Sequence, residues 1–495
     1  MLITKNEGGS VGRKHVWYLF FAFLCGYVGV ISLMQAGVAR TASVATTQWA
    51  SSTVTAPNMS RFEDMVSDDS GNVYAVGWLR SNTQYDFGNS VTVTGASTGV
   101  NPLIVKYNSA GEALWAKSTT SSPNLNAYFY GVTIDGNGDV YAVGDMQGYL
   151  TYNFGDGVSV AGVSSYENVL AVKYSAAGVT QWAKSTVDFN DSSTSYYDVT
   201  TDSSNNVYVV GGYYGTELID LGDGVTVSGG SAGMEWNVLA VKYNSSGTTQ
   251  WARSTVSSSA SSFFYGVTSD TNGNIYASGY ISENQTFDFG NSVTVAGDSS
   301  TERNTVVVKY NSSGLAQWAR STTTAPDASS LEEITSDASG NVYSVGYIDS
   351  TGTFDFGNNV TVSGGYVGST LLIIKYNSDG VAQFARSTVT APNYSLWSSI
   401  TLDGSGNIYV VGAGQYDGEF DFGDSVTASG AYSNGPNVMV VKYSSAGVAQ
   451  WAKTNSVASS GSHYNGVGVD ADDNIYVAGF TLNNTELDLG DTVTV

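Results

Sequence analysis

Aromatic residues that stand just before short predicted strands could form a binding site in this sequence. Such rings can serve as a platform for sugars or peptides, because each offers a large apolar face and several carry a polar tip. The candidate residues for this platform are Tyr128, Phe129, Tyr196, Tyr197, Phe263, Phe264, Trp397, His463 and Tyr464. The alternative is that these rings only fill space inside the fold.

Carboxylates close to these rings offer a second chemistry. Two carboxyl groups can hold a divalent cation, or can act as acid and base on a glycosidic bond. The acids nearest to the aromatic residues are Asp188, Asp191, Asp198, Glu332 and Glu333. A glycosidase would need one pair that the other repeats lack, with a raised pKa.

Further aspartates recur at the start of a repeated turn, where their side chains can accept hydrogen bonds from the turn's own amides. They are Asp68, Asp135, Asp202, Asp270, Asp337, Asp403 and Asp470. We expect this structural role for most of them. The last turn is the most acidic copy, so Asp470, Asp472 and Asp473 are the candidate ligands of a calcium ion. No other cofactor is expected.

Cysteine and histidine are too rare for several classes of site. The only cysteine is Cys25, and the histidines are His15 and His463. Once a leader that includes Cys25 is removed, the chain has no disulfide, no thiolate metal site and no cysteine nucleophile. A Ser-His-Asp triad would have to use His463. We therefore expect a protein without catalytic activity.

The chain of 495 residues is strongly acidic, with a formal net charge of −24. Four of the 19 basic residues but only one of the 43 acidic residues lie in residues 1–45, which leaves −27 on the remainder. Such a surface repels nucleic acid and anionic membranes. The charge favours either solubility in a salty medium or the binding of divalent cations.

The N-terminal residues have the layout of an export signal. Arg13-Lys14-His15 precede an apolar run over residues 16–34, and small residues follow. We interpret residues 1–45 as a cleaved signal peptide, or as an uncleaved signal anchor because the run is about long enough to span a bilayer. Either way we predict a secreted or cell-surface protein with no other membrane segment.

An internal repeat determines the elements that must position these residues. The aromatic residue of a phrase close to Gln-Trp-Ala-Lys/Arg recurs 66 to 69 residues apart, at Trp49, Trp115, Trp182, Trp251, Trp318, Phe384 and Trp451. Each unit holds four short segments rich in Val, Ile, Tyr and Thr, such as residues 265–270, 275–280, 305–310 and 316–322. Four antiparallel strands per unit, repeated radially, predict an all-β propeller over residues 46–495.

The two ends of the chain are expected to meet in one blade. Residues 47–54 form a fourth strand with no partners before them, whereas residues 464–470 and 474–480 form a first and a second strand. About seven four-stranded blades result. The last is incomplete because its third strand is missing, and we infer a C-terminal truncation.

Two further expectations follow from the repeat. The recurring tryptophan should pack between blades, and basic residues such as Lys309 and Arg320 should pair with surface acids. The long and variable connections, from fourth to first strand and from second to third, share one face, where we expect any site.

Three phrases of the repeat carry a family resemblance. They are D-x-x-G-N-[VI]-Y-x-x-G, as from Asp68, F-D-F-G, as from Phe287, and V-K-Y-N-x-x-G-x-x-Q-W-A-[KR], as from Val241. Together, over residues 47–495, they resemble the bacterial SBBP, or beta-propeller repeat, family, although Asp139 and Asn153 depart from the pattern. The resemblance implies a seven-bladed propeller in an exported or surface protein, and it implies no single activity.

These observations favour a noncatalytic extracellular or cell-surface module that binds a protein or a glycan. We expect a monomer that binds no nucleic acid. Two alternatives stay open. One is an enzyme that acts on polysaccharide with carboxylates at the mouth of the propeller, and the other is a structural spacer in a longer surface protein.

Overall fold

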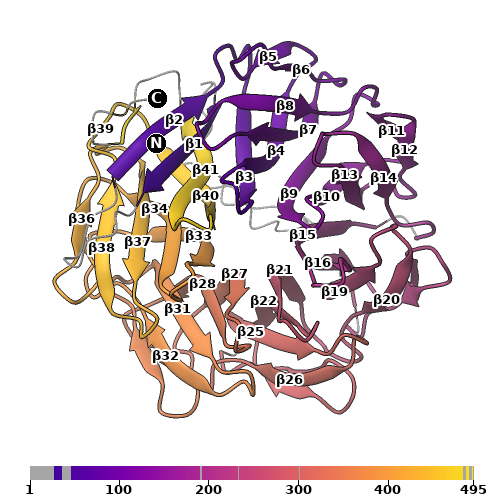
Figure 1. Ribbon diagram of the computed structural model, residues 1–495. Coiled ribbons are helices and arrows are strands. Elements are labelled where there is room, and N and C mark those ends of the chain that lie inside the picture. Colours follow the sequence, from indigo (N-terminus) through magenta and orange to yellow (C-terminus); the bar gives the residue numbers. More distant parts are fainter. Residues whose placement is uncertain are drawn as a thin grey trace, which may run out of the picture.

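The computed structural model describes residues 27–35, 46–189, 192–231, 233–299, 302–482, 487–489 and 493, with the backbone alone for residues 27–35. Every regular element among them is a β-strand (Figure 1). Within this described part of the chain, no helix is long and apolar enough to cross a membrane. Four-stranded sheets stand radially around a central axis, which confirms the predicted all-β propeller architecture.

Six blades are each built from four antiparallel strands, called a, b, c and d from the axis outward. In chain order they are β3 (Ser60–Ser67), β4 (Val73–Arg80), β7 (Val100–Tyr107) and β8 (Ala113–Lys117); β9 (Ala127–Ile134), β10 (Val140–Gln147), β13 (Glu167–Tyr174) and β14 (Thr180–Lys184); β15 (Thr194–Thr201), β16 (Val207–Tyr214), β19 (Trp236–Tyr243) and β20 (Thr249–Arg253); β21 (Ser262–Ser269), β22 (Ile275–Ser282), β25 (Arg303–Tyr310) and β26 (Ala316–Arg320); β27 (Ser329–Ser336), β28 (Val342–Asp349), β31 (Ser369–Tyr376) and β32 (Ala382–Arg386); β33 (Ser395–Leu402), β34 (Ile408–Gln415), β37 (Pro436–Tyr443) and β38 (Ala449–Thr454).

The two ends of the chain meet in a further four-stranded sheet of order β2-β1-β41-β40. Its a and b strands are β40 (Ser462–Val469) and β41 (Asn474–Leu482), and its d strand is β2 (Thr46–Ser52), as the sequence predicts. The predicted gap at strand c is wrong in this structure, because β1 (Tyr27–Gln35) lies there and pairs with both neighbours. A missing strand would leave two unpaired edges, and an extended segment between them satisfies both.

The strand β1 falls inside the apolar run that the sequence assigns to an export signal. Residues 1–26 and 36–45 of that predicted segment lie outside the described residues.

Short hairpins occupy the b–c connections and account for the length of the repeat. They are β5 (Gln84–Asp86) with β6 (Thr92–Thr94), β11 (Thr151–Gly155) with β12 (Val158–Ala161), β17 (Ile219–Asp220) with β18 (Thr226–Val227), β23 (Thr286–Asp288) with β24 (Thr294–Ala296), β29 (Thr353–Asp355) with β30 (Thr361–Ser363), and β35 (Glu419–Asp421) with β36 (Thr427–Ser429). A last pair joins β39 (Val457–Ala458) to β42 (Leu487–Asp488).

An aspartate closes each a–b turn. In one copy, Asp270 Oδ1 accepts the backbone N–H groups of Asn272 and Asn274, both at 2.9 Å. Its Oδ2 accepts the side-chain amide of Asn274 at 2.7 Å and the hydroxyl of Tyr276 at 3.0 Å. The turn role predicted for the repeated aspartates is therefore confirmed in this copy.

The tryptophan of strand d joins each blade to the next. Trp318 lies between Tyr276 of its own blade and Tyr376 of the next one, with ring centroids 5.9 and 6.4 Å away. Its indole N–H donates to the carbonyl of Ser378 in that next blade at 3.1 Å. The expected packing of this ring between blades is confirmed, and it supplies the neighbour contacts that a repeat of this size needs.

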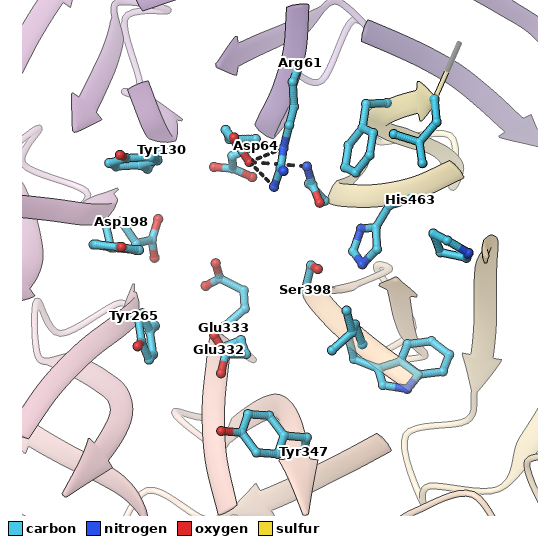
Figure 2. Close-up of a pocket in the computed structure, with 18 of the residues that line it drawn as sticks. Arg61, Asp64, Tyr130, Asp198, Tyr265, Glu332, Glu333, Tyr347, Ser398 and His463 are labelled. Atoms are coloured by element: carbon cyan, nitrogen blue, oxygen red, sulfur yellow. Dashed lines mark hydrogen bonds and ion pairs between the residues drawn. The ribbon is translucent and has the colours of Figure 1, made fainter. Parts of the chain in front are cut away.

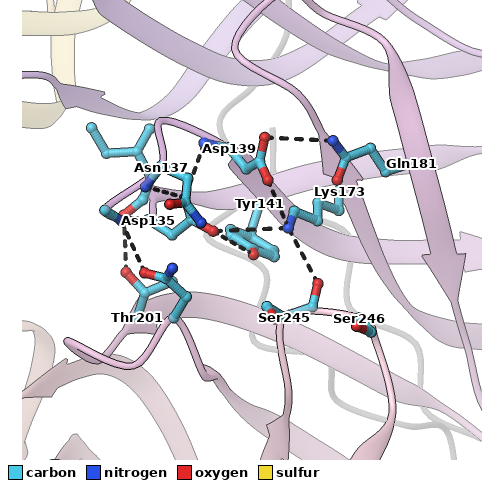
Figure 3. Close-up of polar contacts among 12 residues, drawn as sticks. Asp135, Asn137, Asp139, Tyr141, Lys173, Gln181, Thr201, Ser245 and Ser246 are labelled. Carbon is cyan, nitrogen blue, oxygen red and sulfur yellow. Dashed lines mark hydrogen bonds and ion pairs between the residues drawn. The ribbon is translucent and has the colours of Figure 1, made fainter.

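Basic residues of strands c and d reinforce the same seam. Lys309 donates to the Ser378 carbonyl at 3.0 Å, and Arg320 Nε donates to the Gly380 carbonyl at 2.6 Å. For these two residues the predicted pairing with surface acids is wrong, because the turn of the neighbouring blade presents free carbonyls. Lys173 does form an ion pair, with Asp139 at 2.8 Å (Figure 3), where an aspartate replaces the usual turn asparagine.

Every a strand contains a β-bulge, and a glycine of the b strand makes room for it. In β21 the register shifts between Phe264 and Gly266, so Tyr265 is the extra residue. A Cβ on Gly279, which faces this point from β22, would overlap the carbonyl oxygen of Phe263. The equivalent glycines are Gly77, Gly144, Gly211, Gly346, Gly412 and Gly479. This contact explains the glycine of the repeated Tyr-x-x-Gly phrase.

We expect Gly279→Ala to lower the free energy of unfolding by about 1–3 kcal/mol, because the added methyl meets backbone that cannot rotate away. Urea unfolding of the purified protein measures this change. Gly233→Ala is the control, since a Cβ at Gly233 has no neighbour within 4 Å. Equal stabilities of the two variants would contradict the account of the bulge.

Candidate functional site

A pocket of about 580 Å³ opens on the axis of the propeller, among the inner strands (Figure 2). Its lining includes Arg61 near the start of an a strand, Phe480 near the end of a b strand and Arg303 at the start of a c strand. The pocket therefore lies toward the face of the long d–a and b–c connections, where the sequence places a site.

The bulge residues of the seven a strands all line this pocket. They are Glu63, Tyr130, Tyr197, Tyr265, Glu332, Ser398 and Asn465. A bulge leaves one residue outside the hydrogen-bonded ladder and re-aims its side chain. One structural position thus carries four residue types, whereas the tyrosine and the glycine of strand b are the same in every copy.

One wall of the pocket is aromatic. Tyr130 stacks on Tyr128 with ring centroids 5.7 Å apart, and on Tyr197 at 5.0 Å with an interplanar angle of 15°. Phe263 and Tyr265 continue the wall, at 5.0 and 5.3 Å from Tyr197. Three consecutive inner strands, β9, β15 and β21, supply these rings. They present one apolar surface with phenolic hydroxyls along it.

Three carboxyl groups follow the bulges directly in sequence: Asp64 in β3, Asp198 in β15 and Glu333 in β27. The strands between them carry glycine at this position. A Cβ on Gly131 would come within 2.8 Å of Asp198 Cα, and one on Gly266 within 2.8 Å of Glu333 Cα. The missing side chains let each acidic residue pack against its neighbouring strand.

Two of these carboxyls also join adjacent blades. Asp64 Oδ2 accepts the backbone N–H of Val132 in the next inner strand at 2.9 Å, and Asp198 Oδ2 accepts that of Val267 at 2.6 Å. The floor of the pocket is therefore held by carboxylate-to-backbone hydrogen bonds as well as by packing.

The pKa of Asp64 is raised to about 8, first by burial and then by the charge of the nearby Asp198. Burial likewise raises the pKa of Asp198 to about 7. The pKa of Glu333 lies well above its ordinary value, first through burial and then through the charges of Asp198 and Asp64. The charges of Asp198 and Glu333 interact in this buried site. Since two ionised carboxylates close together repel, their proximity favours the protonated form of the pair.

The opposite wall combines polar and apolar side chains. Arg61 is paired with Glu63, whose Oε2 lies 2.7 Å from Nη2 and 2.8 Å from Nε. His463 stacks on Phe480 with ring centroids 5.9 Å apart, and burial lowers its pKa to about 4, so the imidazole is neutral. The ring faces the pocket (Figure 2), and its Nδ1 has no hydrogen-bond partner among the described residues.

The predicted aromatic platform is only partly brought together. Tyr197, Trp397 and His463 line the pocket, and Tyr128 and Phe263 pack on its tyrosines. The others are buried in the cores between blades instead: Phe129, Tyr196, Phe264 and Tyr464. Neighbours along a strand face opposite sides of the sheet, so only one residue of each predicted pair can reach the axis.

The predicted acids also separate into two groups. Asp198, Glu332 and Glu333 lie in the pocket. Asp188 lies elsewhere, in a bridge with Asp220 beside the β17–β18 hairpin. Asp191 lies outside the described residues.

The candidate calcium residues form an ordinary turn of the repeat. Asp470 Oδ1 accepts the N–H of Asp472 at 3.0 Å, and its Oδ2 accepts the hydroxyl of Tyr476 at 2.9 Å. Asp473 adopts a left-handed conformation, with φ at 62°. In the described part of the chain, no three Asp, Glu, His or Cys side chains are grouped closely enough to hold a metal ion.

Sequence reasoning missed several residues of the pocket, notably Arg61, Glu63, Asp64, Tyr130 and Arg303. A signal for the bulge residues was present. Each of them stands eleven residues before the repeated tyrosine of strand b, so aligning the copies on that tyrosine places them in one variable column.

Comparisons with known proteins add little to this geometry. No family model matches the chain, and no curated protein matches it. A solved structure of a protein of unknown function from Bacteroides caccae is similar at 8% identity and a TM-score of 0.34, covering 72% of this chain and 93% of its own.

We expect the melting temperature to fall as the pH rises from about 5 to about 8, and to level off above that range. A carboxyl whose pKa is raised on folding stabilises the protein fully below its ordinary pKa, and this stabilisation is lost as the pH passes the folded value. For Asp198 and Asp64 these values are about 7 and about 8.

Glu333→Gln should reduce this fall, because it removes one of the three interacting carboxyls. Glu419→Gln, at an exposed position of β35, is the control and should keep the fall of the parent protein. Thermal melts followed by circular dichroism give both curves, and identical pH dependence in the two variants would count against the buried carboxyl cluster.

Proposed function

We propose that the protein is a noncatalytic extracellular or cell-surface binding module whose central pocket takes a glycan. The observation that carries this proposal is where the repeats differ. Framework positions such as the strand-b tyrosine and glycine are invariant among the copies, whereas the bulge residues that line the pocket vary. The varying side chains converge on one pocket, and variable side chains on a rigid scaffold are typical of binding sites.

The chemistry of the lining supports a sugar as the ligand. The rings of Tyr130, Tyr197 and Tyr265 pack on one another and line the pocket together, forming an aromatic wall along which a pyranose ring can lie. The facing side supplies hydrogen-bonding groups from Ser398, His463 and Asn465. An apolar surface with a few convergent polar groups is the usual composition of a small-molecule site.

The proposal also covers the number of blades, the export of the protein and its monomeric state. We propose a seven-bladed propeller of the SBBP type, closed by β40, β41 and β2 with one further strand, and exported through the N-terminal segment as a monomer. The four-stranded closing sheet and the strong acidity of the chain support this view.

A second candidate function rests on the pair of Asp198 and Glu333. The inner strands on either side of Asp198 and Glu333 carry Gly131, Gly266 or Ser399 at this position, so no adjacent strand extends the pair, and its carboxyls have raised pKa values. These are the features expected of a polysaccharide-acting enzyme. Against it, the backbone N–H groups of Val199 and Val267 already occupy both oxygens of Asp198.

Incubation with a panel of polysaccharides, followed by an assay for new reducing ends, separates the two candidates. We expect none to form. Release of reducing ends that Glu333→Gln abolishes would favour the enzyme and contradict the noncatalytic proposal.

For the binding proposal, we expect Tyr197→Ala to weaken glycan binding at least about tenfold, because it removes the ring at the centre of the aromatic wall. Glycan-array screening followed by calorimetry on the full chain measures the effect. Tyr149→Ala is the matched control, since Tyr149 is 56% exposed and lies outside the pocket lining. The proposal fails if no glycan binds, or if both variants bind as the parent protein does.

A further inference from the structure

The two arginines of the pocket differ in how their charges are satisfied. Arg61 is paired with Glu63 at 2.7 Å. Arg303, at the first position of β25, lies with its guanidinium carbon 4.0 Å from the ring centroid of Tyr280. Within the described structure the Arg303 guanidinium makes no hydrogen bond and no ion pair. One face of the group is covered, and the N–H groups at its edge remain available.

A guanidinium that makes no hydrogen bond within the protein can donate to a ligand without first breaking an internal contact. Glu332 interacts with Arg303 electrostatically, and the two form no ion pair in the described structure. Tyr280 packs against Arg303, and Tyr265 and Tyr347 line the same pocket. The Arg303 guanidinium is therefore held in the pocket, and no carboxylate of the described structure forms an ion pair with it.

We propose that Arg303 binds the carboxylate of an acidic sugar, so that the glycan taken by the pocket is one that contains uronic acid residues. This inference rests on the proposed glycan function and adds the class of sugar. The planar fork of a guanidinium matches a carboxylate through two parallel hydrogen bonds, which a sugar hydroxyl cannot accept in the same way. The adjoining tyrosine wall lies where the pyranose ring that carries the carboxylate would rest.

The carboxyl groups of the floor do not oppose such a ligand at neutral pH. Burial raises the pKa values of Asp64, Asp198 and Glu333, which reduces the negative charge of these groups near neutral pH. Burial also raises the pKa of Glu332. A carboxylic acid that keeps its proton in an apolar site can donate a hydrogen bond to an anion, as the neutral carboxyl of an oxyanion hole does.

The test compares uronate oligosaccharides with the same oligosaccharides after reduction of their carboxyl groups to hydroxymethyl groups. Trimers of galacturonate, glucuronate, mannuronate and guluronate serve as probes, and calorimetry on the full chain at pH 7 measures binding. We expect at least one uronate trimer to bind about tenfold or more tightly than its reduced counterpart, which is the size of effect given by a charged hydrogen-bond partner.

Variants then locate this preference. Arg303→Gln should remove it, weakening the uronate about tenfold and leaving the reduced sugar unchanged, whereas Arg303→Lys should retain part of it through the remaining charge. Arg80→Gln, at an exposed arginine outside the pocket lining, should keep the full preference. If Arg303→Gln melts below the parent protein, its lost preference could reflect unfolding. Arg303→Lys is then compared with Arg80→Gln, and a smaller preference for the uronate in Arg303→Lys supports the role of Arg303.

The outcomes separate the two levels of the proposal. If reduced sugars bind as tightly as uronates, or if Arg303→Gln keeps the preference, the assignment of Arg303 is overturned while the glycan function stands. If neither form binds, the glycan function itself fails. Binding of an acidic peptide in place of every sugar would overturn both.

Discussion

The contact between a bulge in strand a and a glycine in strand b is the constraint on which the rest of the structure depends. At Gly279 the two backbones lie so close that even a methyl group would overlap the carbonyl of Phe263. This approach fixes the bulge, and the bulge turns Tyr265 toward the axis. Because every blade repeats the arrangement, the propeller directs seven side chains into one pocket without any loop to hold them.

The seams between blades make that pocket rigid. Trp318 lies between tyrosines of two blades, and Lys309 and Arg320 bind carbonyls across the same boundary. Nearer the axis, Asp198 accepts an amide hydrogen bond from the next inner strand. With the framework held in this way, residues at the bulge can change from blade to blade at little expense to the fold. The bulge residues can therefore be those that suit a ligand.

Much of the fold could be predicted from the sequence, because the repeat fixes strands such as β22 and β25 and the turn at Asp270 by local chemistry. The site was less accessible. Phe264 and Tyr265 are adjacent, and only the position of the bulge decides which ring faces the axis. Arg303 enters the pocket from a different strand, so its role depends on tertiary packing that spacing along the chain does not reveal. The pairing of β1 with β41 could not be predicted either. β1 does not carry the repeat motif, and its place as strand c depends on the open edge that β41 presents.

The central claim is that the axial pocket binds the glycan. A crystal structure of the full chain with a bound uronate oligosaccharide tests this most directly. We expect a sugar ring against Tyr197 and Tyr265, with its carboxylate within hydrogen-bond distance of both terminal nitrogens of Arg303. A sugar bound on the rim, or in the pocket with its carboxylate turned away from Arg303, would contradict it.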